Sequence, residues 1–295
     1  CLEEAAIPVI KGTKSETERF AGAHTTTSIE AMMWDKRALQ SGTSHYFSTN
    51  FAKAFDIQFL NKENVLQHAE TTSWAISSRI IGAMIMVHGD DQGLVMPPRL
   101  APIQAVIVPI FKNDDDKTKV MEVADRIFME LKSAKIRVKM DDRDNVSSGF
   151  KFNDWEMRGV PVRIEIGPKD IEKGTVALAR RDKPGKEGKT FVSQERLDST
   201  VNLLLQEIQD SLLKRATEYR DANIHNPKDF EELKKVVQDG WAFSYWCEST
   251  ECEKKTKEEA KATTRNIPFN QPDKEGTCIV CGKPSKRKVY FARAY

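Results

Sequence analysis

Four cysteines near the end of this 295-residue chain constrain its fold more than any other feature. Cys247 and Cys252 enclose four residues, Cys278 and Cys281 enclose two, and Gly282 follows the second pair as in a knuckle turn. Four thiolates within tetrahedral reach of one ion are the ligands of structural zinc, and a small segment with little core gains folding energy from such an ion. Two disulfides, or four unligated thiols, are the alternative. Because the quartet leaves no coordination position open, we expect the zinc to be structural and not catalytic.

Composition limits the class of protein. Clustering of four of the five cysteines favours a reducing cytoplasm with a metal site over a secreted disulfide framework. The longest apolar run, residues 80–87, is far shorter than the ~20 residues of a membrane span, so we expect a buried helix there and no membrane association. The net charge is only +2, so any contact with nucleic acid requires a local basic patch. The chain begins at Cys1 without an initiator methionine, and we expect a fragment or a processed piece.

Changes in pattern predict three domains and a mixed α/β and α+β fold. Residues 1–100 alternate threonine- and glycine-rich loops with apolar strands, which is typical of an antiparallel sheet. Residues 101–220 alternate strands with helices of 3.6-residue periodicity, which predicts a small three-layer α/β domain around a mixed sheet. Residues 221–295 are expected to form a small α/β domain around the zinc. The elements expected in the middle domain are strands at 104–110, 136–140, 160–167 and 174–180 and helices at 120–135 and 197–219.

Two segments of the first domain carry polar side chains where a core would be apolar. Residues 38–45 place small, hydroxyl-bearing and imidazole side chains around Gly42, which indicates the lip of a pocket; an ordinary polar turn is the alternative. Arg79 follows two serines at the entrance of the apolar run. A guanidinium offers a planar fork of donors that suits phosphate oxygens, whereas a surface charge or a helix-end ion pair is the simpler interpretation.

The middle domain mixes one aromatic ring with acids and cations in a short stretch. Unpaired RNA bases stack on aromatic rings, carboxylates accept from base N–H groups, and lysine or arginine donates to keto oxygens. Guanine suits such a set best, because its Watson–Crick edge offers two donors and its O6 and N7 are acceptors. We expect the five side chains to converge on one surface, with a salt-bridged sheet edge as the alternative. They are Phe152, Glu156, Arg163, Lys169 and Asp170.

Taken together, these motifs resemble prolyl-tRNA synthetase of the archaeal and eukaryote-like type. The resemblance extends over essentially the whole chain, and its motifs occur in the family's order. They are Phe20–Ala23, Gln40–His45, Ser77–Arg79, Phe150–Phe152, Gly167–Asp170, the cysteine spacing and Phe291–Tyr295.

The resemblance implies a proline–tRNA ligase, in which the carboxylate of L-proline attacks the α-phosphate of ATP and the prolyl group then passes to tRNA(Pro). Mg²⁺ accompanies the ATP, and Arg79 is the catalytic arginine of the third class II signature. The middle domain reads the two guanines of proline anticodons, and the C-terminal Tyr295 lies against the catalytic domain. Proline is expected to contact Phe20, Thr43, His45, Ser73 and Trp74. ATP is expected to contact Gln40, Thr43, Ser77 and Arg79.

One departure from the family matters. The first two class II signatures, which carry the dimer interface, a proline-clamping Thr/Glu pair and further arginines, normally precede Cys1 and are absent from this chain. We therefore expect this polypeptide to bind the anticodon stem and to activate proline poorly or not at all, and we expect the full-length protein to be a homodimer. A truncated tRNA-binding module without catalysis, related to class II synthetases, is the alternative function.

Overall fold

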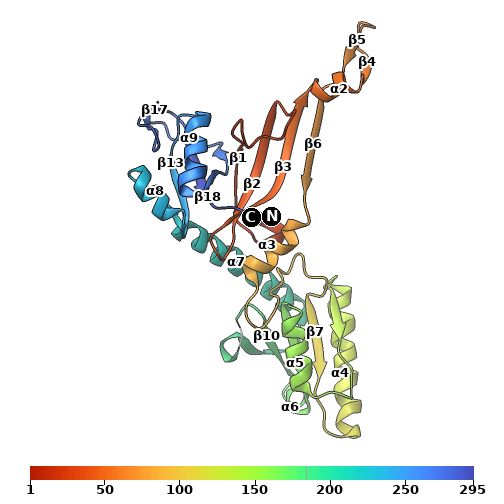
Figure 1. The fold of residues 1–295 in the computed structure, drawn as a ribbon. Coiled ribbons are helices and arrows are strands. Elements are labelled where there is room, and N and C mark those ends of the chain that lie inside the picture. The colour runs from red at the N-terminus through yellow and green to blue at the C-terminus, as the bar shows by residue number, and fades with distance from the viewer. Residues whose placement is uncertain (184) are drawn as a thin grey trace. The chain divides into compact units, whose positions relative to one another are not determined.

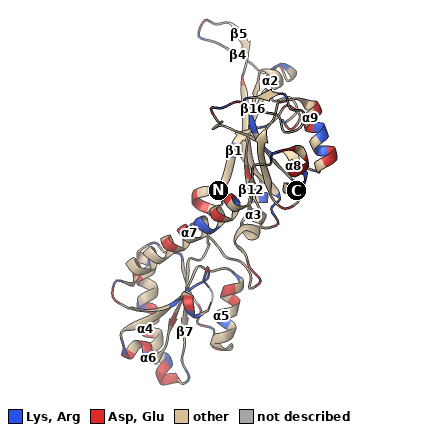
Figure 2. Cartoon of the chain, turned by 90° about the vertical axis from the view of Figure 1, so that its left-hand side faces the viewer, with Lys and Arg blue, Asp and Glu red and all other residues tan. Residues whose placement is uncertain are grey.

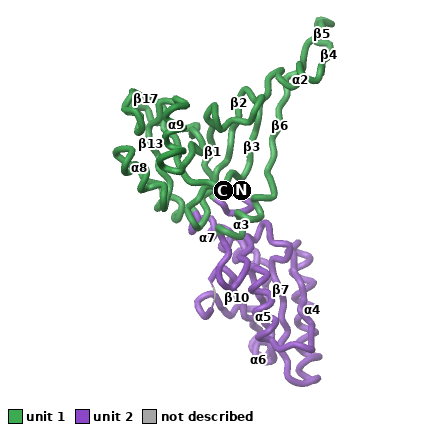
Figure 3. The backbone as a smooth tube through the Cα atoms, viewed as in Figure 1, with its two compact units in different colours: residues 1, 8–87, 217–295 green, residues 2–7, 88–216 purple. Residues whose placement is uncertain are grey.

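The structure, a computed structural model, describes residues 1–183 and 185–295 (Figure 1). The chain divides into two compact units (Figure 3). Unit 1 contains residues 1, 8–87 and 217–295, and unit 2 contains residues 2–7 and 88–216. The two segments expected to be a catalytic part and a zinc domain thus contribute to the same unit. Lysine and arginine are interspersed with aspartate and glutamate in both units, in keeping with the low net charge (Figure 2).

Unit 1 is built on a five-stranded antiparallel sheet, as expected for its first segment. The strand order is β15-β1-β2-β3-β6. The edge strand β15 comes from the C-terminal segment and pairs with β1 at Gly12 and Thr13. A Cβ at Gly12 would lie 2.2 Å from the carbonyl oxygen of Ile267, so only glycine permits this close approach. The strands are β1 (Val9–Thr13), β2 (Thr25–Met32), β3 (Ala38–Ser48), β6 (Thr71–Ile76) and β15 (Ile267–Pro268).

Between β3 and β6 the chain forms a helix and a hairpin, and another helix follows β6. A hairpin of β4 (Gln58–Leu60) and β5 (Leu66–His68) follows the short helix α2 (Asn50–Ala54). The apolar run forms helix α3 (Arg79–His88), as predicted. Its complete burial, however, was a wrong expectation, because Ile81 and Ile85 are 59% and 45% exposed and only one side of the helix is packed.

The C-terminal segment of unit 1 has a four-stranded sheet of order β12-β13-β18-β14. Its core includes Leu233, Trp246, Val289 and Phe291, all buried. The strands are β12 (Ile224–His225), β13 (Trp241–Tyr245), β14 (Thr263–Thr264) and β18 (Lys288–Ala292), with a separate pair β16 (Gly276–Thr277) and β17 (Pro284–Ser285). The helices are α8 (Phe230–Val236), α9 (Thr250–Lys255) and a π-helical turn, η2 (Thr256–Ala260).

Unit 2 has the expected mixed sheet with helices on both faces. Strand β7 runs parallel to β8 and β9, whereas β10 is antiparallel to both β9 and β11. Helices α4 and α7 cover one face, and α5 covers the other face through Trp155. The strands are β7 (Ala105–Pro109), β8 (Val138–Met140), β9 (Val162–Ile166), β10 (Thr175–Arg180) and β11 (Lys189–Ser193). The helices are α1 (Leu2–Ala5), α4 (Asp114–Ser133), α5 (Ser148–Met157), α6 (Pro168–Glu172), η1 (Lys186–Gly188) and α7 (Leu197–Ala222), whose residues 197–216 belong to this unit.

Side-chain capping fixes where two helices of unit 2 begin. The side chain of Asn113 accepts a hydrogen bond from the Asp116 amide at the start of α4, and Ser147 does the same for Phe150 at the start of α5. Within the described residues, none of the helices has both the length and the apolar character that crossing a bilayer requires.

Candidate functional site

A cavity of about 280 Å³ lies in unit 2, on the face of the sheet that carries α5. Strand alternation explains its polar walls, because Val162 and Ile164 of β9 enter the core on the opposite face while Arg163 and Glu165 point toward the cavity. The polar and aromatic lining residues are Phe152, Glu156, Arg163, Glu165, Arg180, Arg181, Lys186 and Lys189.

Arg163 is the centre of this cavity wall. Its guanidinium lies over the Phe152 ring, 4.1 Å from the ring centroid. Its Nη1 donates to Glu156 Oε1 at 2.6 Å, and its Nε donates to Glu165 Oε1 at 3.0 Å. The second oxygen of Glu165 accepts from Lys189 Nζ at 2.6 Å. Two carboxylates and a ring therefore hold the guanidinium plane in one orientation.

Glu156 and Glu165 differ in how many of their carboxylate oxygens are free to accept a further hydrogen bond. Glu165 is buried and both of its oxygens are used by cations of the sheet. The side chain of Glu156 is 32% exposed, and its Oε2 has no hydrogen-bond partner within the described part of the chain. Arg163 uses two of its five N–H donors. The cluster is thus a salt-bridged patch on the face of the central strand β9, and among the described residues it retains one free acceptor and three free donors for a ligand.

Five cations and two carboxylates line the cavity, but four of the five cations are already paired, Arg163 and Lys189 as described above and Arg180 and Arg181 with carboxylates outside the lining. Arg180 bonds Asp182, and Arg181 bonds Asp90 with both terminal nitrogens. Lys186 is exposed and forms no ion pair with any residue that the structure describes. Lys186 is therefore the lining cation that remains available to an anionic polymer such as RNA.

Lys169 and Asp170 are not among the residues that line this cavity, so three of the five expected side chains meet there. Both lie on α6, where Asp170 Oδ2 accepts a hydrogen bond from the Gly167 amide at 2.9 Å and caps the helix. Ile171, the next residue, packs against the core on the other face of the sheet. Lys169 is exposed to solvent on this helix. Helix capping is the physical reason for the Asp170 position.

Sequence reasoning missed five lining residues: Glu165, Arg180, Arg181, Lys186 and Lys189. Glu165 could have been predicted, because it follows Arg163 by two residues in a predicted strand and so shares its face. The other four reach the cavity from β10, the residue after it, β11 and η1 through pairing that local pattern does not specify.

In unit 1, four of the residues expected to bind proline or ATP share one face of the sheet. In the β2–β3 register, Gln40 lies opposite Glu30, Thr43 opposite Ser28 and His45 opposite Thr26. Ser73 of β6 lies opposite His45. Paired residues of an antiparallel sheet point to the same side, so these polar side chains form one surface.

His45 is held in this surface by ring contacts and one hydrogen bond. The Phe20 ring lies 5.0 Å from the imidazole centroid, and the Phe47 ring stacks at 5.8 Å. Nδ1 lies 2.9 Å from Thr26 Oγ1. Burial lowers the pKa of His45, so the imidazole is neutral at pH 7 and serves as a hydrogen-bonding and packing group.

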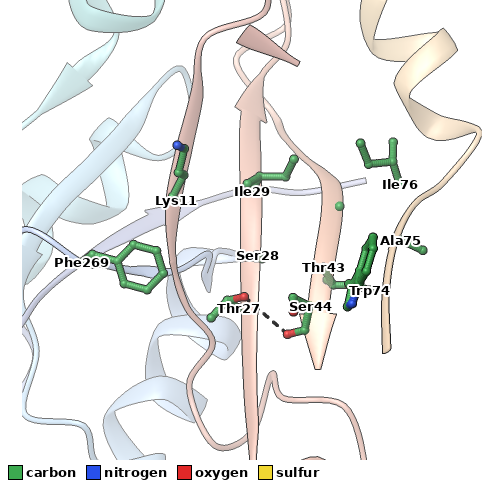
Figure 4. A pocket seen from close by; sticks show the side chains of 11 residues that line it. Lys11, Thr27, Ser28, Ile29, Thr43, Ser44, Trp74, Ala75, Ile76 and Phe269 are labelled. Carbon is green, nitrogen blue, oxygen red and sulfur yellow. Dashed lines mark hydrogen bonds between the residues drawn. The ribbon is translucent and has the colours of Figure 1, made fainter. Parts of the chain in front are cut away.

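Trp74 faces the opposite side of the sheet. It lies opposite Ser44 in the register and is 76% exposed. With Ile29, Gly42 and Ile76 it lines an open cavity of about 530 Å³ (Figure 4). Thr43 also lines this cavity, whereas Phe20, His45 and Ser73, with which Trp74 was grouped, do not.

Ser77 and Arg79 follow the end of β6. The β3–β6 pairing ends at Gly42 and Ile76, so Gln40 and Ser77 continue two neighbouring strands at the same end of the sheet. The Arg79 amide donates to Ser77 Oγ at 3.4 Å and starts α3. The Arg79 side chain has no acidic partner among the described residues, which leaves its guanidinium available to an anion.

The C-terminal residues pack on the turn between β2 and β3. The Ala38 amide donates to the carbonyl of Arg293 at 2.7 Å, and the Tyr295 hydroxyl donates to Asp35. Arg37 lies over the Tyr295 ring at 5.5 Å. Burial, together with the nearby Asp35 carboxylate, raises the pKa of Tyr295 to about 12.

The four cysteines come together as predicted. Their Sγ atoms all lie within 4.8 Å of one another, and Cys247 Sγ is 3.6 Å from those of both Cys252 and Cys281. A tetrahedral zinc with bonds of ~2.3 Å requires sulfur–sulfur separations of about 3.8 Å, so the quartet fits that ion. Gly282 has a φ of +73°, and its amide donates to the Cys278 carbonyl, which forms the knuckle turn.

The pKa values of the cysteine thiols shift in different directions within the quartet. Burial raises the pKa of Cys252 and of Cys247. The backbone amide of Lys283 lowers the pKa of Cys281 to about 7. Four adjacent thiolates repel one another, so all four are deprotonated together only when a metal compensates their charge.

Comparison with known proteins agrees with this geometry. Residues 104–202 match the family model for an anticodon binding domain, and residues 230–295 match the model for the C-terminal domain of prolyl-tRNA synthetase. The chain is 54% identical over 293 residues to the proline–tRNA ligase of Roseiflexus sp. (strain RS-1), 53% identical over 293 residues to that of Chloroflexus aggregans, and 48% identical over 298 residues to the chloroplastic/mitochondrial proline–tRNA ligase of Arabidopsis thaliana.

These matches cover 99–100% of this chain but 55–61% of the relatives, so the chain spans little more than half of their length. The cavity around Arg163 lies within the segment that matches the anticodon-binding model, and the cysteine quartet lies within the segment that matches the C-terminal model. The chain belongs to the prolyl-tRNA synthetase family and carries its anticodon-binding and C-terminal domains.

Proposed function

We propose that this chain is part of a proline–tRNA ligase and that unit 2 recognises the anticodon of tRNA(Pro). The observation that carries the proposal is the Phe152–Arg163–Glu156 cluster, which lines a cavity with basic side chains inside the anticodon-binding segment. A guanine base stacks on the ring or on the guanidinium plane. Its N1–H and N2–H groups donate to the free oxygen of Glu156, and the free donors of Arg163 reach O6 or N7.

Phosphate contacts supply the remaining affinity. Lys186 and the surrounding basic side chains neutralise the backbone of the anticodon loop, which holds the base in register without reading it. The two contributions separate experimentally, because phosphate contacts weaken with added salt and base contacts distinguish sequences. Lys169 and Asp170, although first assigned to the base, are proposed only as parts of α6 that border the domain.

The polar sheet face of unit 1 is proposed as the adenylate-forming site. Proline lies against Phe20, Thr43, His45 and Ser73, and a neutral His45 avoids repelling the proline ammonium. ATP lies toward Gln40, Thr43, Ser77 and Arg79 at the end of the strands, with Mg²⁺ on its phosphates. The unpaired Arg79 guanidinium stabilises the charge that builds at the α-phosphorus as the proline carboxylate attacks.

This assignment leaves Trp74 apart from the proline site. Its side chain points to the opposite sheet face, so its proposed contribution is to the structure around β6. The cysteine quartet is proposed as a structural zinc site, held by Cys247, Cys252, Cys278 and Cys281. We also propose that the full-length protein is a cytoplasmic homodimer of the archaeal and eukaryote-like type. The cysteine quartet and the C-terminal tyrosine support this type.

Two experiments test this function. The first titrates the chain with tRNA(Pro) and with a tRNA whose anticodon lacks guanine, at two salt concentrations. A preference for tRNA(Pro) that persists at the higher salt supports base reading, whereas equal affinities would refute it. The second measures proline-dependent exchange of pyrophosphate into ATP. We expect little or no exchange from this polypeptide, and exchange at the rate of the relatives would contradict that expectation.

A truncated tRNA-binding module remains the alternative. Both functions predict tRNA binding by unit 2, so only the proline site separates them. Addition of proline with a non-hydrolysable prolyl-adenylate analogue should shift the resonances of His45 if the adenylate site is real. Unchanged resonances at saturating analogue would favour the binding module.

A further inference from the structure

Glu253 is a buried carboxylate next to the cysteine quartet, and nothing in the proposed function uses it. It lies on α9 directly after Cys252 and is 6% exposed. No lysine or arginine pairs with it among the described residues. Three hydroxyls satisfy it instead: Ser15 Oγ donates to Oε1 at 2.7 Å, Thr264 donates to the same oxygen, and Thr17 donates to Oε2. A buried carboxylate without hydrogen-bond donors would be strongly unfavourable. The contacts from Ser15 and Thr17 therefore hold the chain before β2 against α9.

Two of the three donors belong to residues 14–24, the segment between β1 and β2, which we call the pocket loop. Phe20 follows Thr17 by three residues, and its ring contacts His45 at 5.0 Å. Phe20 is 52% exposed, so packing supplies only part of what fixes its place. The position of the ring against His45 therefore depends on how the beginning of the loop is anchored.

A second anchor lies at the first residue of the pocket loop. Lys14 Nζ donates to Glu30 Oε1 at 2.8 Å and to the carbonyl of Arg265 at 2.7 Å, while Arg265 pairs with Glu30 at 3.0 Å. All three side chains are buried. This charged anchor holds β1, β2 and β14 together without α9, so loss of the Glu253 contacts is expected to free the loop without separating the strands.

We propose that Glu253 is a positioning residue that ties the pocket loop to α9, and thereby makes the place of Phe20 depend on the metal-bound cysteine quartet. Cys252 is the quartet's ligand on α9, and Ser249 caps that helix by accepting from the Cys252 amide. A metal that fixes Cys252 also fixes the next residue, Glu253. The inference rests on the proposed function only in treating Phe20 and His45 as part of the proline site.

The test uses the 295-residue chain loaded with zinc and two readouts that do not require catalysis. The first is amide hydrogen exchange of residues 15–24. The second is the Cε1–H resonance of His45, which feels the ring current of Phe20; the chain has five histidines, so the spectrum is simple. Phe20→Leu supplies the reference resonance without the ring. The variants are Glu253→Gln and, from the loop side, Thr17→Val, which removes one donor at an exposed position.

Glu258→Gln is the matched control, because Glu258 is an exposed carboxylate that follows Glu253 by five residues. We expect Glu253→Gln to raise exchange in residues 15–24 by about tenfold or more, as for the loss of hydrogen bonds to a charged acceptor, and Thr17→Val to raise it by less. The His45 resonance should move toward that of Phe20→Leu in both variants. Zinc content and the protection of the β13–β18 ladder should stay at the parent level, as should all readouts of Glu258→Gln.

Removal of zinc by a chelator tests the dependence on the quartet. In the parent chain, chelation should reproduce the effects of Glu253→Gln on the loop and on His45, and in Glu253→Gln it should add less than about twofold to loop exchange, since the connection is already broken. Unchanged loop exchange and an unmoved His45 resonance in Glu253→Gln would overturn the inference. Amide exchange of residues 15–24 that stays unchanged when zinc is removed from the unmodified chain would also overturn it. Proline enters neither readout, so failure of the proline assignment would appear separately, as a His45 resonance that does not respond to the adenylate analogue.

Discussion

Replacement of Glu156 by glutamine tests the reading of guanine at a single oxygen. The substitution keeps the shape of the side chain and one acceptor for Arg163, but it replaces the free carboxylate oxygen by an amide donor that faces the N–H edge of guanine. A partly exposed ion pair contributes about 0–1 kcal/mol to stability, so the fold should tolerate the change. A lost base contact costs about 1–3 kcal/mol of binding free energy, and the second effect should dominate.

The assay is a double cycle of protein and tRNA variants. Each 1.4 kcal/mol corresponds to a tenfold change in the dissociation constant, so Glu156→Gln should weaken binding of tRNA(Pro) by about 5- to 150-fold. Binding of a tRNA whose anticodon guanines are replaced should change by less than about threefold. Glu258→Gln is the control, because Glu258 is an exposed carboxylate in unit 1, outside the anticodon-binding segment. Equal weakening for both tRNAs would show that Glu156 does not read the base.

The remaining predictions concern the fold. Protein purified without added zinc should carry about one zinc per chain by metal analysis, and Cys278→Ser should lower both the zinc content and the melting temperature; metal-free protein of undiminished stability would contradict the structural role. Burial raises the pKa of Asp141, but hydrogen bonds from Arg143 and Trp155 outweigh it and lower this pKa to about 2. The ionised carboxylate therefore adds ~2 kcal/mol to the free energy of unfolding above pH 4, and this contribution is lost as the pH falls toward 2. Acid titration of unfolding for the parent and Asp141→Asn should therefore converge below pH 2, and parallel curves would refute this. Gly12→Ala should destabilise the chain by about 1–3 kcal/mol in denaturant titration because its Cβ has no space beside β15, and a neutral effect would refute the close approach.

Sequence pattern predicted the elements that depend on local chemistry. The helical stripe through Val120, Ile127 and Leu131 is buried as its spacing requires, and the alternation in β9 placed Arg163 on the face away from the core. The cysteine spacing predicted the metal cluster because a tetrahedral site restricts which separations can close. In each case the signal lies within a few residues of sequence.

Contacts between distant segments were not predictable in this way. Strand β15 completes the sheet of unit 1 through residues more than two hundred positions from β1, and Lys189 reaches Glu165 only because β11 and β10 pair beside β9. Asp170 shows a different limit: a carboxylate near other recognition residues in sequence served as a helix cap. The residue type of Asp170 and its closeness in sequence to the other recognition residues indicated a contact with a ligand. In the structure its carboxylate accepts a hydrogen bond from the backbone amide of Gly167 instead.

The central claim is that the Phe152–Arg163–Glu156 cluster reads guanine in the proline anticodon. Its most direct measurement is the ratio of dissociation constants of the unmodified chain for tRNA(Pro) and for the same tRNA with both anticodon guanines replaced by adenine. At about 1–3 kcal/mol for each base, we expect a ratio above about 20 that survives an increase in salt. A ratio near one, with both affinities falling together as salt rises, would contradict the account.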